Sequence, residues 1–175
     1  MIYTQLTKKA MRIAYEVHKD QVDKAGAPYI FHPFYIAEQM DTEEEMIVAL
    51  LHDVLEDGNL SIEELRSCGF SECALDAICC LTYDGTLEYM DYIIGIRPDP
   101  LATKVKLADL RHNSDITRLD LIDDKANERT KRYKWAIEVL LASDGELQIW
   151  DDRIRKHIPL DDERLFFLSI YSDKK

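Results

Sequence analysis

The chain has 175 residues, of which 46% are hydrophobic, and it carries a formal net charge of −12 at pH 7. Its length suits one domain with a sizeable buried core. No run of about 18 uncharged apolar residues occurs, so we expect no transmembrane helix and no membrane partner. The negative charge argues against a long nucleic acid as partner, because neutralising a phosphate backbone requires clustered Lys and Arg.

Apolar residues recur at helical spacing along most of the chain, and no strand-length alternation of apolar and polar residues is convincing. The sequence therefore predicts a single all-α helical bundle. The first helix is expected over residues 4–21, followed by a loop over 23–28 and a short helix over 33–40. Thr42 and Glu45 form a capping box that begins a helix expected to run to Asp57, with Gly58 just beyond it.

A second capping box, formed by Ser61 and Glu64, begins a short helix that ends before Gly69. Later helices are expected over residues 71–81, 87–95, 101–113 and 125–142, the last of them stopped by Gly145. In the tail, 153–157 is expected to be helical and 165–171 to be a helix or a strand. We expect a domain of residues 1–142 and a C-terminal extension of residues 143–175, packed on or flanking it. This extension either caps the bundle or mediates self-association into a homo-oligomer.

The four cysteines, Cys68, Cys73, Cys79 and Cys80, form no C-x-x-C pair. Adjacent cysteines such as Cys79 and Cys80 have a poor geometry for a disulfide or for two zinc ligands. The N-terminus lacks a basic-then-apolar signal pattern, so we expect a cytoplasmic protein whose cysteines are reduced thiols, mostly packed in the core.

The sharpest chemical feature is the stretch L-L-H-D-V-L-E-D at residues 50–57. On a helix, Glu56 and Asp57 lie one turn beyond His52 and Asp53, so four titratable groups would share one side of an apolar helix. Burying them without a cation would cost several kcal/mol, and a divalent metal would relieve that cost. The alternative is a solvent-facing acidic helix end. It opposes the helix dipole and leaves the histidine in an apolar stretch unexplained.

Two further residues have the right chemistry to join this group. His32 follows a rigid turn, and Asp109 lies in an apolar helix. Alone, His32 would more often be a packed or capping residue, and Asp109 would more often pair with a nearby Lys or Arg. Together with His52 and Asp53, they make a mixed nitrogen and oxygen ligand set. Such a set suits Mn, Fe, Zn or Mg with positions open to water, in contrast to a closed, cysteine-rich zinc site.

Four motifs in order, over roughly residues 3–142, resemble the HD-superfamily hydrolase domain of the RelA/SpoT alarmone enzymes and its small single-domain relatives. They read G-x-P-Y-I-x-H-P, A-L-L-H-D-V-x-E-D, L-T and V-K-L-A-D-x-x-H-N. The resemblance implies an HD-type helical fold and a metal-dependent hydrolase. The implied reaction removes pyrophosphate from the 3′ position of ppGpp or pppGpp, giving GDP or GTP. The 33 residues after Ala142 are too few for the synthetase half of the long enzymes.

The resemblance also implies a role for each matching residue. One divalent ion, usually Mn, would be held by His32, His52, Asp53 and Asp109. The pair Glu56 and Asp57 would assist the attacking water, with Glu56 orienting or deprotonating it. Substrate binding would fall to Asn113 and Lys24.

One position departs from the family pattern. The alarmone hydrolases usually carry Arg-Lys before G-x-P-Y-I, and this chain has Asp23-Lys24. An aspartate cannot stack on a purine as a guanidinium can and would repel phosphates. If Asp23 weakens alarmone binding in this way, Asp23→Arg should improve activity on ppGpp. The alternative is that Asp23 accepts hydrogen bonds from a ring or from a sugar hydroxyl of the substrate.

Three functions stay open at this point. They are an alarmone 3′-pyrophosphohydrolase, an HD phosphohydrolase of another phosphorylated nucleotide or cofactor, and a nucleotide-sensing helical domain without catalysis. The complete ligand set with its Glu-Asp pair argues against the last. Further candidates for phosphate contacts, each more often a surface ion pair, are Lys104, Lys106, Arg111 and Arg118.

Overall fold

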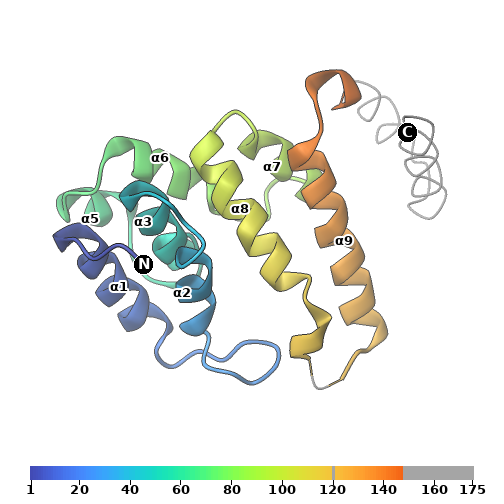
Figure 1. Ribbon diagram of the computed structural model, residues 1–175, viewed down its shortest axis with the longest axis horizontal. Coiled ribbons are helices and arrows are strands. Elements are labelled where there is room, and N and C mark those ends of the chain that lie inside the picture. Colours follow the sequence, from blue (N-terminus) through green and yellow to red (C-terminus); the bar gives the residue numbers. More distant parts are fainter. Residues whose placement is uncertain (120, 148–175) are drawn as a thin grey trace. The chain divides into compact units, whose positions relative to one another are not determined.

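A computed structural model describes residues 1–119 and 121–147 (Figure 1). These residues form helices and no strand, with one isolated bridge between Val22 and Pro28. The predicted all-α fold is thereby confirmed. None of the helices in this part of the chain is long and apolar enough to cross a membrane. The chain divides into two compact units, Met1–Leu140 and Leu141–Lys175.

The first unit is built around α3 (Glu43–Leu51), which contacts α1 (Gln5–His18), α2 (Phe31–Ala37), α6 (Glu72–Leu81) and α8 (Pro100–Asn113) (Figure 1). All residues of α3 from 46 to 51 are buried. This stretch after the acidic first turn is apolar on every side and has to be enclosed by other helices, and this explains the central place of α3.

Side-chain caps begin several of these helices, as the sequence predicts for two of them. Thr42 and Glu45 form the capping box of α3, and Ser61 and Glu64 form that of α5 (Ile62–Ser67). A third box, between Thr4 and Thr7, begins α1. Each box satisfies backbone N–H groups that the first turn of a helix leaves without partners.

The expected continuous helix to Asp57 is wrong, because the chain leaves the helix at His52 and Asp53 and resumes it as α4 (Val54–Asp57). Asp53 has φ −104° and ψ −2°, outside the usual helical values. The side chain of His52 explains the break: its Nδ1 lies 2.8 Å from the carbonyl oxygen of Ala49. In a continuous helix that carbonyl would accept the N–H of Asp53, so the imidazole competes with the backbone bond.

The later helices follow the predicted spans closely. They are α7 (Tyr89–Ile96), α8 and α9 (Asp124–Leu141), with an unexpected single 3-10 turn, η1 (Ile116–Arg118), after α8. In the second unit the described residues end at 147, and a helical turn over 144–147 includes Gly145, which we expected to stop a helix. The helix and the helix-or-strand expected over 153–157 and 165–171 lie outside the described residues.

The expectation that the cysteines are mostly packed in the core is wrong. All four are free; Cys68 is half-buried and the other three are exposed. The reason for the exposed cysteines of α6 is the orientation of this helix, whose buried face consists of Ala74, Leu75, Ala77, Ile78 and Leu81.

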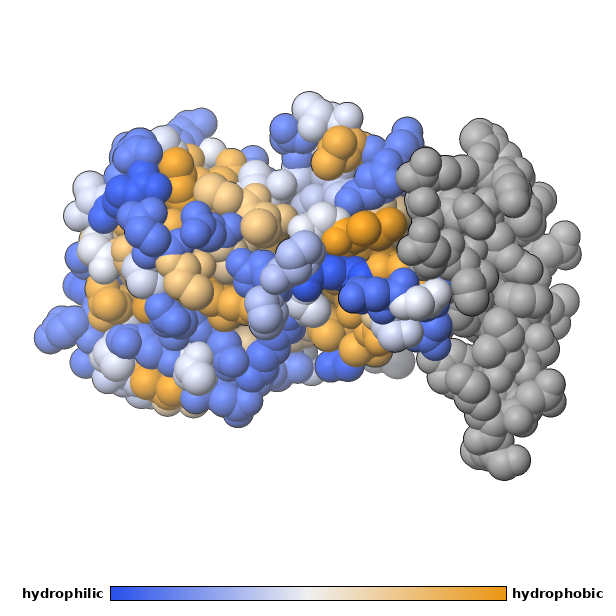
Figure 2. Space-filling view, turned by 90° about the horizontal axis from the view of Figure 1, so that it is seen from above, coloured by the Kyte–Doolittle hydropathy of each residue, from blue (hydrophilic) through white to orange (hydrophobic). Residues whose placement is uncertain are grey.

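On the face of the molecule that is seen from above in Figure 2, hydrophilic and hydrophobic residues are interspersed.

Candidate functional site

His32 of α2, Asp109 of α8 and His52, which directly follows α3, lie together in the interior of the first unit. The three residues are 3%, 2% and 4% exposed. One ligand atom from each lies within 4.8 Å of the others. Nε2 of His32 is 3.2 Å from Oδ1 of Asp109, and Nε2 of His52 is 4.0 Å from the same oxygen. This is a compact cluster of possible metal-ligating atoms.

Asp53, the fourth predicted ligand, lies against the same cluster. Its Oδ2 is 3.0 Å from Nε2 of His52 and 3.8 Å from Nε2 of His32. The hydroxyl of Tyr29 donates a hydrogen bond to this oxygen. Consecutive side chains on a regular helix point about 100° apart. His52 and Asp53 converge because the helix breaks between α3 and α4. The structure therefore brings all four predicted ligands to one place.

The hydrogen bond of His52 leaves one of its nitrogens suited to a metal. Nδ1 must donate to the carbonyl of Ala49, since a carbonyl only accepts. Nε2 is buried and forms no hydrogen bond with any described residue, although it faces the carboxylates. A buried ring nitrogen without a hydrogen bond, aimed at two carboxylates, is the arrangement expected of a metal ligand.

The charges around His52 also call for a cation. Burial opposes protonation of His52, but Asp53 and Asp109 outweigh it and raise its pKa to about 9. Burial alone would raise the pKa of both carboxyls. Instead the pKa of Asp53 is lowered, chiefly by His52, and that of Asp109 chiefly by Lys106. The cluster thus attracts positive charge at Nε2, and a divalent cation held by the same atoms would supply it.

Asp109 has two kinds of partner, one on each oxygen. Its Oδ2 lies 2.9 Å from Nζ of Lys106, and its Oδ1 faces the two histidines. Nδ2 of Asn113, one turn further along α8, donates to Oδ1 at 2.5 Å. The ion pair with Lys106, which the sequence offered as the alternative role of Asp109, is present. It occupies Oδ2 and leaves Oδ1 for the cluster.

Glu56 and Asp57 lie outside the cluster of buried ligand atoms, on the exposed side of α4. Glu56 accepts a hydrogen bond from the backbone N–H of Tyr83, and Oδ2 of Asp57 is 3.8 Å from Nδ1 of His18. Partial burial and the negative charge of Asp53 raise the pKa of both carboxyls. A carboxylate with a raised pKa holds a proton more readily, which suits proton transfer.

Lys24, in the loop before α2, is influenced by the positive charges of two arginines of α9. Burial and the charges of Arg129 and Arg132 lower the pKa of Lys24. The guanidinium carbon of Arg132 lies 4.9 Å from the ring centroid of Tyr89. Repulsion between Lys24 and these arginines favours binding of an anion.

Among the other residues predicted to contact phosphate, Lys104 pairs at the surface with Asp41 and Glu45, and Arg111 is exposed.

Asp23 is not the free negative charge that the sequence suggests. Its Oδ1 accepts the backbone N–H groups of Ala25 and Ala27, each at 2.9 Å, and its Oδ2 accepts from Arg118 at 2.5 Å. An arginine at position 23 would lose the two loop hydrogen bonds and face the guanidinium of Arg118. From these contacts we expect Asp23→Arg to disturb this loop, in contrast to the improved activity on ppGpp that the sequence predicts.

Several residues around the site were not singled out from the sequence. They are His18, Tyr29, Tyr35 and His112. Tyr29 and His112 stand within the G-x-P-Y-I and D-x-x-H-N motifs, so the motifs carried a signal for them. His18 and Tyr35 have none, because their contacts depend on the folded arrangement.

Comparison with known proteins relates the chain to a group of nucleotide enzymes, although no protein-family model matches it. It is 31% identical over 156 residues to the "Probable guanosine-3′,5′-bis(diphosphate) 3′-pyrophosphohydrolase" of Synechocystis, a match that covers 81% of this chain and 20% of that protein. It is 28% identical over 159 residues to the guanosine-3′,5′-bis(diphosphate) 3′-pyrophosphohydrolase of Aquifex aeolicus, covering 82% and 22%. The chain thus spans about a fifth of the length of these relatives.

The fold has a counterpart among solved structures. A metazoan ortholog of SpoT, described as hydrolysing ppGpp and as playing a role in starvation responses, superposes with a TM-score of 0.68. The match covers 89% of this chain and 97% of that one, at 20% sequence identity. At this identity, the likeness establishes the shared helical fold.

The cluster predicts how metal retention depends on its residues. His52→Ala and Asp53→Asn should lose stoichiometric divalent metal, by more than the roughly 10- to 100-fold typical of outer partners of a metal site. Elemental analysis after gel filtration measures this, with circular dichroism to confirm helicity. Asp76→Asn, on the exposed face of α6, is the matched control and should retain metal. Stoichiometric metal in both site variants would show that the ligands lie elsewhere.

Proposed function

We propose that this chain, a homologue of the RelA/SpoT-type pyrophosphohydrolases, is a metal-dependent phosphohydrolase that removes pyrophosphate from the 3′ position of ppGpp and yields GDP. The observation that carries the proposal is the cluster of two histidines and two aspartates, in which His32, His52 and Asp109 are buried, Asp53 is partly buried, and Nε2 of His52 is aimed at the carboxylates. A purely nucleotide-sensing domain has no need of such a cluster.

We assign His32, His52, Asp53 and Asp109 as the residues that hold one divalent ion, and we propose Mn as that ion. Mixed imidazole and carboxylate donors suit Mn, and also Fe, Zn or Mg. When bound, such an ion would lower the pKa of water and polarise a phosphoryl oxygen. Asn113, which contacts Asp109, places its amide beside the cluster, where it is available to a nucleotide.

The reaction needs a proton acceptor on one side and a proton donor on the other. Water adds to the phosphorus attached to the 3′ oxygen and gives up a proton. The bond between this phosphorus and the 3′ oxygen breaks, and the 3′ oxygen takes up a proton. Glu56 is the proposed acceptor, because its carboxylate is accessible and held by the N–H of Tyr83. Asp57, close to His18, is the proposed guide of a proton to the leaving oxygen.

The phosphates have a complementary surface within an otherwise acidic protein. The positive charges of Arg129 and Arg132 act on Lys24, and this repulsion falls when an anion binds. The ring of Tyr89 beneath Arg132 adds an aromatic surface. These features favour a ligand with several phosphates and a flat base, as in a nucleotide.

A second substrate remains a candidate on one observation. Position 23 carries a carboxylate where the guanine enzymes usually have an arginine, and the guanidinium that lies beside it belongs to Arg118 and is paired with that carboxylate. This favours an HD phosphohydrolase that acts on another phosphorylated nucleotide or cofactor.

The direct test is hydrolysis by the purified chain in the presence of Mn. The panel contains ppGpp, pppGpp, the adenine counterpart, nucleoside monophosphates and a 3′-phosphorylated cofactor, and released phosphate and pyrophosphate are measured separately. The proposal expects pyrophosphate and GDP from ppGpp. Turnover of another nucleotide with ppGpp intact would favour the second candidate. No turnover with Mn, Zn, Fe or Mg would contradict a catalytic function.

The role of Glu56 predicts a separation of metal binding from turnover. Glu56→Gln should keep the metal and lower the turnover number by about 10²- to 10⁴-fold, because a positioned proton acceptor is lost. Glu63→Gln, a surface residue of α5, is the matched control and should turn over normally. Wild-type turnover in Glu56→Gln would remove this carboxyl from the reaction.

A further inference from the structure

His112 lies between the proposed metal ligand His32 and the guanidinium of Arg118. Nδ1 of His112 is 2.6 Å from Nδ1 of His32 and 3.3 Å from NH1 of Arg118. The two imidazole planes differ by only 19° and their centroids are 4.9 Å apart, so the short contact runs nearly in the plane of both rings. One nitrogen of His112 thus faces two neighbours that compete to donate to it.

The chemistry of arginine decides where the protons sit. A guanidinium has N–H donors, has no acceptor and does not lose its charge in proteins. A nitrogen that faces it at hydrogen-bond distance must therefore be an acceptor. If Nδ1 of His112 accepts, Nδ1 of His32 must carry the proton that the two rings share. Nε2 of His32 then has a free lone pair, and this is the atom 3.2 Å from Oδ1 of Asp109.

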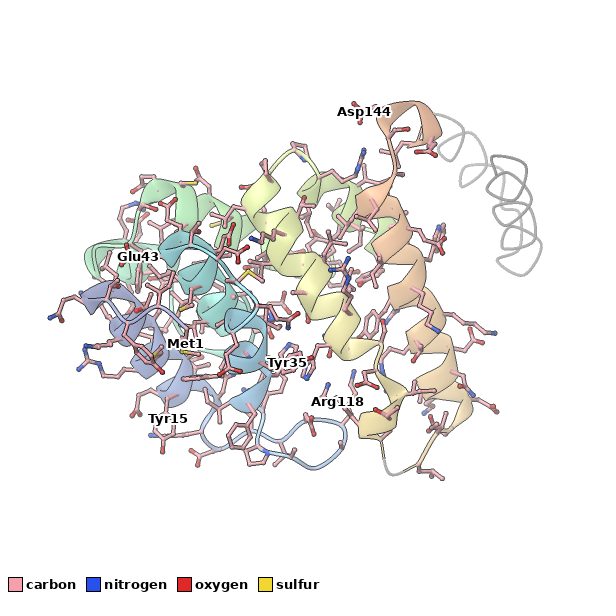
Figure 3. The ribbon with its side chains drawn as sticks, in the orientation of Figure 1. Met1, Tyr15, Tyr35, Glu43, Arg118 and Asp144 are labelled. Carbon is pink, nitrogen blue, oxygen red and sulfur yellow. The ribbon has the colours of Figure 1, made fainter. Side chains whose placement is uncertain are left out.

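Arg118 is held firmly enough to impose this choice. Its NH2 donates to Oδ2 of Asp23 at 2.5 Å, and its NH1 also donates to the backbone carbonyl of His112 at 3.2 Å. Asp23 is itself fixed by the backbone of its loop. On the other side, the ring of Tyr35 stacks on His112, with centroids 4.3 Å apart. Figure 3 shows Tyr35 on α2 and Arg118 after α8 on the same side of the bundle.

We propose that Arg118 is a positioning residue that, anchored by Asp23, holds His112 as an acceptor and so keeps His32 in the tautomer whose Nε2 binds the metal. A metal-ligating histidine usually donates its second N–H to a carboxylate or a carbonyl, which can only accept. An imidazole can donate or accept, so His112 alone would leave the tautomer of His32 unset. Because Arg118 only donates, it fixes His112 as the acceptor and His32 as the donor of the hydrogen bond between the two rings. The proposal rests on the proposed metal site.

Two substitutions at position 118 separate the donor role from mere space filling. Arg118→Lys keeps a side chain that only donates, whereas Arg118→Gln offers both a donor and an acceptor. Manganese affinity of the full chain should fall about 10- to 100-fold in Arg118→Gln, the usual scale for an outer partner, and stay within a few-fold of wild type in Arg118→Lys. Arg66→Gln removes an exposed arginine that pairs with Glu63 and Glu72, and should leave affinity unchanged.

A second measurement reads the tautomers directly. In wild-type protein loaded with zinc, long-range proton–nitrogen NMR should show Nδ1 of His32 protonated and Nδ1 of His112 unprotonated. Arg118→Gln should show a mixture at His112. A proton on Nδ1 of His112 in the wild type, or wild-type metal affinity in Arg118→Gln, would overturn the proposal. This wild-type spectrum decides the matter even if Arg118→Gln does not fold.

The two proposals can fail separately. If ppGpp is hydrolysed but Arg118→Gln binds manganese as tightly as wild type, the role of Arg118 is wrong and the enzymatic function stands. If no nucleotide is cleaved but the metal affinities and tautomers follow the predicted pattern, the role of Arg118 stands and the enzymatic function is wrong.

Discussion

The structure depends on keeping two carboxylates, the buried Asp109 and the partly buried Asp53, ionised beside two imidazoles. Burial opposes this, and isolated charges at such a place would cost several kcal/mol each. Lys106 compensates Oδ2 of Asp109. The remaining oxygens face His32 and His52, where a proton or a cation supplies the balancing charge. A divalent ion meets this requirement with both ring nitrogens unprotonated.

The helical bundle provides the rigidity that this arrangement needs. Residues 46–51 of α3 are all buried, so its last turn has a fixed place, and α2 and α8 both contact α3. The break after Leu51 then directs the side chains of His52 and Asp53 toward the same point. Groups that must act on solvent or substrate, such as Glu56, follow on the exposed turn of α4. The side chains of the cluster and the accessible carboxylate of Glu56 thus lie within a few residues of each other along the chain.

Much of this could be predicted from the sequence, because helix periodicity and capping boxes act over a few residues. The capped starts of α3 and α5 and the gathering of the four proposed ligands followed from such local patterns and from motif order. The break at Asp53 could not, since it requires the side chain of His52 to reach the carbonyl of Ala49.

Contacts between distant parts of the chain were the other gap. The aspartate at position 23 looked like a repulsive charge, because its partner Arg118 lies 95 residues away in the sequence.

The central claim, that His32, His52, Asp53 and Asp109 bind one divalent ion, is tested most directly by anomalous X-ray scattering from crystals grown with manganese. The account predicts one manganese peak bonded to Nε2 of both histidines and to both carboxylates. A peak that involves Glu56 and Asp57 without the histidines, or no peak between the four residues, would contradict it.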